Sequence, residues 1–234
     1  MIPKTIHYCW FGPKPIPKLV IKCINTWKKK LPEYTIILWN EKNSPMDIDF
    51  VKQAYKSKKY AFVSDYVRFW VLYNEGGIYL DTDMFVVKSL DPLLQNKLFF
   101  GWETPEKSSI SCGIIGTEKG NPFLKLILDE YAVISFDRKN IEDLIVPRIV
   151  SKIYGENISH YENKIKLYPY DYFYPFPFNK KEEISTFLDC KTDNTYAIHL
   201  WNLSWVTSYR KALYLFVKKI KKLKAKLINK PNQC

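Results

Sequence analysis

Two aspartates one residue apart carry the most informative chemistry in this sequence. Asp81 and Asp83 follow the β-type run Ile78-Tyr79-Leu80, which itself follows a Gly-Gly break, so we predict a strand that ends in two carboxylates. Positions i and i+2 of an extended backbone face the same side, so both carboxylates can face one ligand. Neighbouring carboxylates repel each other unless one is protonated or a metal lies between them, and oxygen donors select Mg²⁺, Mn²⁺ or Ca²⁺.

A bare Asp-x-Asp pair has a simpler explanation, because many strands end in a solvated acidic turn. The preceding Gly-Gly-Ile-Tyr-Leu favours a functional interpretation over that one. A divalent metal held by few protein oxygens usually completes its coordination shell with substrate phosphates. The pair therefore predicts a metal site that binds a phosphorylated substrate.

The elements in front of this pair indicate an α/β fold. The residue pattern predicts a strand over Thr5–Trp10, a helix over Ile16–Lys30, a strand over Thr35–Trp39 and a helix over Phe50–Lys58. Such alternation favours a parallel sheet with crossover helices. Aromatic residues at helical spacing then predict the buried face of another helix: Phe62, Tyr66, Phe69, Trp70 and Tyr73.

That helix carries Asp65 and Arg68 one turn apart. Taken alone, this pair is best explained as an exposed ion pair within the helix, which stabilises it by about a few tenths of a kcal/mol.

Four blocks of sequence, in order along residues 1–205, match the motifs of a known family. They begin at Ile2, Ser64, Tyr73 and His199. They read Ile-Pro-Lys-Thr-Ile-His-Tyr-Cys-Trp-Phe-Gly, Ser-Asp-Tyr-Val-Arg, Tyr-Asn-Glu-Gly-Gly-Ile-Tyr-Leu-Asp-Thr-Asp and His-Leu-Trp-Asn-Leu-Ser-Trp. Together they resemble glycosyltransferase family 32, the DXD sugar transferases that include yeast initiating mannosyltransferases, bacterial capsular polysaccharide transferases and, more distantly, the large clostridial glucosylating toxins.

The resemblance implies roles for individual residues of a donor site. It implies that Asp83 binds the metal directly and that Asp81 binds the donor ribose or the metal. It also implies that Asp65 accepts hydrogen bonds from sugar hydroxyls and that Arg68 places positive charge near the donor. For Asp65 and Arg68 this replaces the interpretation as a surface ion pair.

Further residues matched by the resemblance surround the nucleotide. Trp10 matches a tryptophan that stacks on the uracil, with an ordinary core tryptophan as the alternative. The resemblance also assigns Tyr79 to the nucleotide-sugar site, and it implies that Ser204 and Trp205 cap the phosphates.

His199 is a candidate third metal ligand. It follows the β-type run Tyr196-Ala197-Ile198, and imidazole is an acceptable Mn²⁺ ligand in mixed nitrogen and oxygen sites. Residue type alone leaves a core histidine equally open, and the resemblance favours the ligand. Asn202 or Ser204 could take its place. His7, on the first predicted strand, is more simply explained as a structural histidine.

The resemblance also implies an activity and a fold. The fold is of GT-A type, a single nucleotide-binding α/β domain with a Rossmann-like mixed sheet. The activity is a metal-dependent retaining glycosyltransferase with Mn²⁺ or Mg²⁺ as cofactor. The donor is expected to be a nucleotide-diphosphate sugar, UDP-sugar foremost, carrying a hexose or N-acetylhexosamine. The acceptor is expected to be a glycan, lipid-linked, in the synthesis of a capsule or other surface polysaccharide.

The basic charge of the chain is concentrated towards its C-terminal end. The net charge is +12, and nine of the 36 basic residues lie after Asp193, where no acidic residue follows. Apolar residues of this tail share one helical stripe: Leu213, Phe216, Ile220, Leu223 and Leu227. Basic amphipathic helices bind anionic membrane surfaces, and the alternative is a terminal helix that packs on the domain. Nucleic-acid binding is disfavoured, because no aromatic residue interleaves with the late lysines.

We expect a catalytic domain over residues 1–207 and a basic tail over 208–234, because no Pro/Gly/Ser-rich linker or repeat divides the chain. Five widely spaced cysteines without a Cys-x-x-Cys pair argue against a disulfide framework and a zinc site. No apolar run approaches about 18 residues, and prolines interrupt the N-terminal stretch, so we expect neither a membrane span nor a signal peptide. The expected location is the cytoplasm, peripheral on the inner face of the cell membrane.

The segment from Tyr168 to Phe178 is rich in aromatic residues and contains three prolines, which exclude a regular helix and a central strand. We expect an irregular segment that packs on the sheet, with a border to the acceptor as the alternative.

Two other function classes stay open. A sugar nucleotidyltransferase or phosphohydrolase would also use clustered aspartates and a metal. It would need a Gly-rich phosphate loop near the N-terminus, where this chain has only Gly12. A non-enzymatic basic membrane-binding adaptor would explain the tail but not the ordered blocks in front of it.

Overall fold

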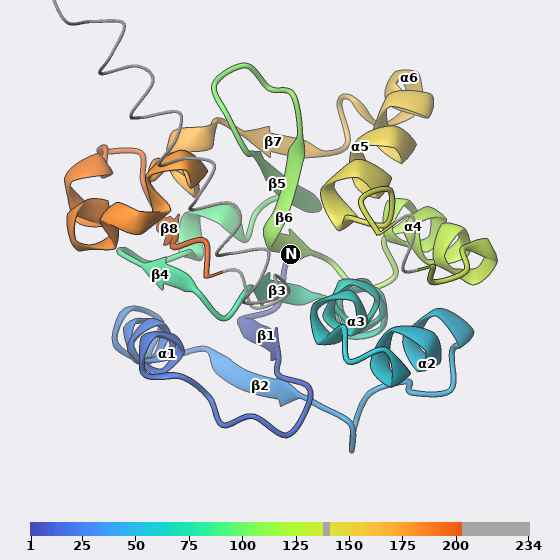
Figure 1. The fold of residues 1–234 in the computed structure, drawn as a ribbon. Helices are drawn as coiled ribbons and strands as arrows, with labels where there is room; N and C mark the ends of the chain where they lie inside the picture. Colours follow the sequence, from blue (N-terminus) through green and yellow to red (C-terminus); the bar gives the residue numbers. More distant parts are fainter. Residues whose placement is uncertain (138–140, 203–234) are drawn as a thin grey trace, which may run out of the picture. The chain divides into compact units, whose positions relative to one another are not determined.

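A six-stranded mixed sheet organises residues 1–137 and 141–202, which are the residues that the computed structural model describes (Figure 1). Its strand order is β2-β1-β3-β6-β5-β7. The strands are β1 (Thr5–Cys9), β2 (Thr35–Trp39), β3 (Gly77–Leu80), β5 (Leu98–Trp102), β6 (Ile110–Thr117) and β7 (Lys166–Tyr168). Strand β1 is parallel to β2 and β3, whereas β6 is antiparallel to both β3 and β5. The mixed sheet implied by the family resemblance is therefore confirmed.

A second, two-stranded antiparallel sheet joins β4 (Met84–Val86) to β8 (Ala197–His199). The α-helices are α1 (Lys18–Lys30), α2 (Asp49–Lys56), α3 (Tyr60–Glu75), α4 (Pro122–Val133), α5 (Val146–Glu156) and α6 (Ile158–Tyr161). Three 3-10 segments complete the order: η1 (Asp91–Leu93), η2 (Tyr170–Tyr172) and η3 (Phe178–Cys190). The first four predicted elements are confirmed to within two residues at each end.

Two layers of apolar side chains cover the large sheet. Helices α2 to α5 lie on one side, and α1 lies on the other side with β4 and β8 (Figure 1). Successive side chains of a strand point to opposite faces of the sheet, so each strand contributes to both layers. In β3, Tyr79 packs on the α3 side, while Ile78 and Leu80 pack on the α1 side. A sheet covered on both faces explains why β3 and β6 are buried along their whole length.

Helix α3 leads directly into the strand that precedes the aspartate pair. Gly76 and Gly77 both have positive φ angles, 68° and 97°, which glycine adopts without strain. A Cβ atom on Gly77 would lie 2.8 Å from the Thr5 carbonyl oxygen, so a side chain there would push β3 away from β1. The Gly-Gly pair therefore both ends the helix and allows β3 to pair with β1.

The buried face of α3 is wider than the aromatic spacing predicts. Val63, Val67, Val71 and Leu72 are buried in addition to the predicted aromatics, while Trp70 and Tyr73 are only half-buried. Asp65 and Arg68 are buried as well, so the interpretation as an exposed ion pair is wrong.

His7 is a structural histidine, as expected from its place on β1. The indole N–H of Trp39 donates to Nδ1 at 3.1 Å, so Nε2 carries the hydrogen and donates to the Gly76 carbonyl oxygen at 2.9 Å. Burial lowers the pKa of His7 from 6.5 to about 4.

Acid should therefore destabilise the fold through His7. Between pH 6.5 and pH 4 the unfolded chain binds a proton at this histidine and the folded chain does not, so the free energy of unfolding should fall by about 3 kcal/mol as the pH is lowered through this window. Urea unfolding at pH 7.5 and pH 4.5 measures this loss. His7→Gln should show a smaller loss than the wild type, and the exposed His160→Gln should match the wild type. Equal losses in all three proteins would contradict the assignment.

Within the described residues, no helix has the length and apolarity needed to cross a membrane. The described part forms one unit over Met1–Asn202. Ser204, Trp205 and the predicted basic helix over 208–234 lie outside it.

Candidate active site

The two aspartates lie in a tight turn between the large sheet and the small one. The Asp81 N–H donates to the Gly113 carbonyl oxygen of β6 at 2.7 Å, and the Met84 N–H donates back to the Asp81 carbonyl oxygen at 2.9 Å. The predicted strand ends at Leu80, as expected. The two carboxylates converge because of this turn, however, and not by alternation along an extended strand, so that part of the prediction is wrong.

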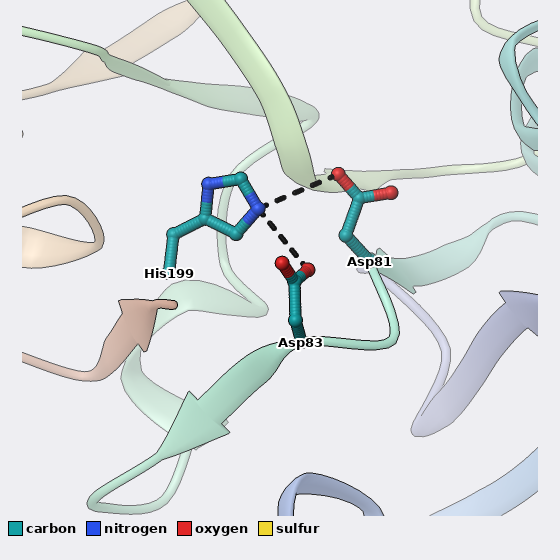
Figure 2. A group of neighbouring side chains, drawn as sticks. All are labelled: Asp81, Asp83 and His199. Atoms are coloured by element: carbon teal, nitrogen blue, oxygen red, sulfur yellow. Dashed lines mark hydrogen bonds and ion pairs between the residues drawn. The ribbon is translucent and has the colours of Figure 1, made fainter. Parts of the chain in front are cut away.

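His199 reaches the aspartates from the other end of the chain. Strand β8 pairs with β4 so that His199 lies opposite Met84, next to Asp83. Its Nε2 atom lies 3.1 Å from Oδ1 of Asp83 and 4.0 Å from Oδ2 of Asp81 (Figure 2). The predicted strand in front of His199 is confirmed, and the three side chains point towards one another from two segments, the aspartate turn and β8 (Figure 2).

The Asp83 carboxylate is buried and strongly held. Besides His199, the Asn202 N–H donates to its Oδ2 atom at 2.6 Å. The preceding residue, Trp201, has a φ angle of 56°, an uncommon conformation for a bulky residue, which turns the Asn202 N–H towards Asp83. The indole N–H of Trp201 donates to the Phe176 carbonyl oxygen at 2.7 Å. Burial opposes the charge on Asp83, but the charge of His199 and these hydrogen bonds outweigh it and lower the pKa of Asp83. Burial alone would lower the pKa of His199. The negative charges around it, foremost that of Asp83, together outweigh burial, so the pKa of His199 is raised.

Asp81, Asp83 and His199 fit a divalent metal ion. Two ligands of one ion lie at most twice the metal–ligand distance apart, about 4 to 5 Å for Mg²⁺ or Ca²⁺. One ligand atom from each of the three residues falls within 4.8 Å of the others. Two carboxylates with one imidazole suit Mn²⁺ or Mg²⁺ better than a thiophilic metal. Nε2 of His199 faces both carboxylates and is the atom available to such an ion, while Nδ1 is buried without a hydrogen-bond partner among the described residues.

Arg68 ties helix α3 to the aspartate turn. Its Nη2 atom lies 2.6 Å from Oδ1 of Asp65, and its Nη1 atom lies 3.3 Å from Oδ1 of Asp81. Nη1 also donates to the Cys112 carbonyl oxygen of β6 at 2.7 Å. Burial raises the pKa of Asp65, and the Arg68 charge only partly offsets this. One buried guanidinium thus lies beside two carboxylates, those of Asp65 and Asp81.

Tyr79 lies beneath Asp81 and not on the surface of the site. Its hydroxyl donates to Oδ1 of Asp81 at 3.1 Å, and the Arg68 guanidinium packs over its ring at 4.6 Å. Only 2% of Tyr79 is exposed. This arrangement lets Tyr79 orient Asp81, whereas direct contact with a nucleotide-sugar, as the resemblance implies, would require the ring to leave the core.

Trp10 lies at the same edge of the sheet as the aspartates. It follows β1, which is parallel to β3, so the ends of both strands lie side by side. The ring is half-buried, and its indole N–H donates to the Lys14 carbonyl oxygen at 2.8 Å. A half-buried ring held in this way is compatible with stacking on a ligand.

The structure adds residues that the sequence did not single out. A Cβ atom on Gly113 would lie 3.2 Å from Oδ2 of Asp81 and 3.3 Å from the Tyr174 hydroxyl, so a side chain there would crowd the aspartate turn and these two groups would have to shift by a few tenths of an ångström. Tyr174 is buried, accepts a hydrogen bond from the Ile114 N–H at 3.2 Å, and packs edge-on against His199. Phe173 is buried with Tyr174 in the apolar layer on the large sheet, and Phe176 is buried in a separate cluster with Ile198 of β8, so this part of the aromatic and proline-rich segment packs on the two sheets.

Residues 17–100 match the family described as the glycosyltransferase sugar-binding region containing a DXD motif. This match supports the resemblance to the DXD glycosyltransferases over that part of the chain. Inositol phosphoceramide mannosyltransferase 3 of Schizosaccharomyces pombe is 34% identical to this chain over 128 residues, which are 53% of this chain and 35% of the relative. Mannosyl phosphorylinositol ceramide synthase CSH1 of Saccharomyces cerevisiae is 32% identical over 136 residues, 54% of this chain and 35% of the relative. The chain thus spans about a third of the length of these two relatives.

Other relatives are similar over more of their length. The uncharacterized glycosyltransferase L373 of Acanthamoeba polyphaga mimivirus is 27% identical over 221 residues, 88% of this chain and 84% of the relative. Among solved structures, the PaToxG glycosyltransferase has a TM-score of 0.53 at 23% identity and covers 68% of this chain and 70% of its own. A glycosyltransferase involved in glycosylation of the major capsid of PBCV-1 has a TM-score of 0.52 at 12% identity, over 85% of this chain and 93% of its own. These likenesses concern the fold, and they confirm the predicted GT-A type.

Proposed function

We propose that this protein is a glycosyltransferase that depends on a divalent metal and moves a hexose or N-acetylhexosamine from a nucleotide-diphosphate sugar, UDP-sugar foremost, to a glycan acceptor with retention of anomeric configuration. The observation that carries the proposal is the group formed by Asp81, Asp83 and His199, whose ligand atoms lie within 4.8 Å of one another. A site built from two carboxylates and an imidazole has no evident use in packing, because it places like charges together at the edge of the sheet.

Each of these residues has a proposed role in the reaction. Sugar transfer breaks the bond between the anomeric carbon and the diphosphate, and the leaving oxygen gains negative charge. A bound Mn²⁺ or Mg²⁺ supplies positive charge to that diphosphate. Asp83 and His199 would hold the ion, and Asp81 would either join them or bind the donor ribose. The buried Arg68 fixes Asp81 from behind.

The sugar and the base need their own contacts. Asp65 is the proposed acceptor for hydroxyls of the donor sugar, and Arg68 adds positive charge beside it. Trp10 stacks on the base. Ser204 and Trp205 are proposed to cap the phosphates from outside the described residues. Because the described site offers no evident nucleophile, we favour departure and attack on one face of the sugar, which needs no covalent enzyme intermediate.

We further propose a lipid-linked acceptor in surface polysaccharide synthesis, and a peripheral location on the inner face of the cell membrane. Support comes from the basic tail over 208–234 and from two relatives whose names describe transfer to ceramide lipids. Sedimentation with anionic and neutral vesicles tests the membrane proposal. Equal binding to both kinds of vesicle would reject it.

Trp10→Ala should weaken nucleotide binding. If the ring stacks on the base, its removal should reduce the affinity for UDP by about 1 to 3 kcal/mol, as for other stacks of bases on aromatic rings. Titration calorimetry measures the affinity. Trp70→Ala removes another half-buried indole, on the opposite face of the sheet, and should leave UDP affinity unchanged. Unchanged affinity in a folded Trp10→Ala protein would make Trp10 a packing residue.

The reaction type itself is tested by a panel of UDP- and GDP-sugars with Mn²⁺. We expect release of the nucleoside diphosphate from at least one donor, in water or with a glycan acceptor present. A nucleotidyltransferase would instead consume a nucleoside triphosphate and a sugar 1-phosphate and release pyrophosphate. Activity in that second assay alone would overturn the proposal.

A further inference from the structure

Glu103 lies at the same edge of the sheet as the aspartate turn. It directly follows β5, and its N–H donates to the Ser109 carbonyl oxygen at 3.0 Å, so its backbone continues the ladder between β5 and β6. Strands β3 and β5 are both antiparallel to β6, which lies between them, so both end at one edge. Asp81 and Glu103 each come directly after one of these strand ends.

Strand alternation turns Glu103 towards the face that carries His199. Phe100 and Trp102 pack with the α3 side of the sheet. Gly101 is on the other face, where a Cβ atom would meet the rings of Phe173 and Tyr174 at 2.7 and 3.0 Å. Glu103, two positions further along, therefore shares that face with Tyr174, which itself packs against His199.

The electrostatics agree with this placement. Burial raises the pKa of Glu103, and the positive charge of His199 partly offsets that rise. The two side chains are thus close enough for one charge to act on the other.

The Glu103 carboxylate has no protein partner within the part of the chain that the structure describes. Among residues 1–137 and 141–202, neither a hydrogen bond nor an ion pair reaches its oxygens, although the side chain is half-buried. Removing a carboxylate from water without a partner costs free energy. Half-buried charged groups that lower the stability of the fold in this way are typical of functional sites. Asp65 differs, because its Oδ1 atom is already bound to Arg68 at 2.6 Å.

We propose that Glu103 is a sugar-binding residue whose carboxylate accepts a hydrogen bond from a hydroxyl of the sugar at the metal site, either the transferred sugar or the acceptor sugar. This proposal rests on the proposed function and adds to Asp65 a second carboxylate that binds sugar hydroxyls. The hydroxyl donates its hydrogen to the carboxylate, and no bond is made or broken at Glu103.

The test compares Glu103→Gln with Glu106→Gln, which removes an exposed carboxylate from the same hairpin loop. Donor hydrolysis in water and transfer to an acceptor are both measured, using the donor on which the wild type acts. Glu103→Gln should reduce transfer by about tenfold or more, the usual loss when a hydrogen bond to a charged group is weakened. Glu106→Gln should match the wild type.

The two assays separate the two sugars. If Glu103 binds the transferred sugar, hydrolysis and transfer should fall together. If it binds the acceptor, transfer should fall and hydrolysis should persist. Wild-type rates in both assays for Glu103→Gln would overturn the proposal, whereas a wild type without activity on any donor would overturn the proposed function instead.

Thermal melting separates binding from a structural role. Because Glu103 has no partner among the described residues, Glu103→Gln should melt at the wild-type temperature or above it. Activity lost together with a clearly lower melting temperature would make the carboxylate structural and would overturn the proposal.

Discussion

Asp83→Asn should abolish sugar transfer while leaving the fold intact. The substitution keeps the shape of the side chain but removes the negative charge that faces Nε2 of His199 at 3.1 Å. A metal ion contributes several kcal/mol to the stabilisation of leaving-group charge, so the rate of donor hydrolysis should fall by about a thousandfold or more. Steady-state release of nucleoside diphosphate measures the loss, and circular dichroism checks that the variant is folded.

A matched control distinguishes this effect from the general effect of removing one carboxylate from the protein. Asp143→Asn removes an exposed carboxylate that, in the described part of the chain, pairs only with Arg148, at 3.0 Å. It should retain wild-type activity. If folded Asp83→Asn protein were as active as this control, Asp83 would have no role in sugar transfer.

Arg68→Met should have the largest effect on stability. The guanidinium lies between Asp65 and Asp81, and all three groups are wholly or largely removed from water. Its removal leaves two uncompensated carboxylates, and breaking a buried ion pair from one side costs about 3 to 5 kcal/mol. Urea unfolding at neutral pH measures this cost. Donor hydrolysis should be lost as well, because Asp81 loses the group that fixes it.

The surface pair of Arg148 with Asp143 again provides the control. Arg148→Met should cost about 0 to 1 kcal/mol, because both side chains are mostly exposed. Adding Asp65→Asn to Arg68→Met should restore part of the stability, because one of the two unpaired charges is then removed. Equal costs for Arg68→Met and Arg148→Met would contradict the role given to Arg68.

The elements from β1 to β3 were predictable because their signals are local. Apolar spacing and the Gly-Gly break lie within each segment, so the sequence indicates where each helix and strand runs. The antiparallel β6 gives no such signal, since a strand buried on both faces reads as an apolar run in either direction. The sequence therefore indicates parallel pairing for β1 to β3 and leaves β6 open.

The site depends on contacts that no local pattern contains. Asp83 and His199 are 116 positions apart, and the pairing of β4 with β8 brings them together. The resemblance to a family suggested His199, but the residues alone left a core histidine equally open. Spacing likewise placed Arg68 one turn from Asp65 but could not indicate burial, which comes from β6 packing over α3. Gly113 and Glu103 became visible only when β5, β6 and the aspartate turn were seen together.

In the proposed mechanism, sugar transfer requires a divalent ion at Asp81, Asp83 and His199. The most direct measurement is donor hydrolysis by the wild type with Mn²⁺, after a chelator is added, and after Mn²⁺ is returned in excess. We expect activity to be lost with the chelator and restored with the metal, and Asp83→Asn to stay inactive under all three conditions. Full wild-type activity in the chelator would contradict this mechanism.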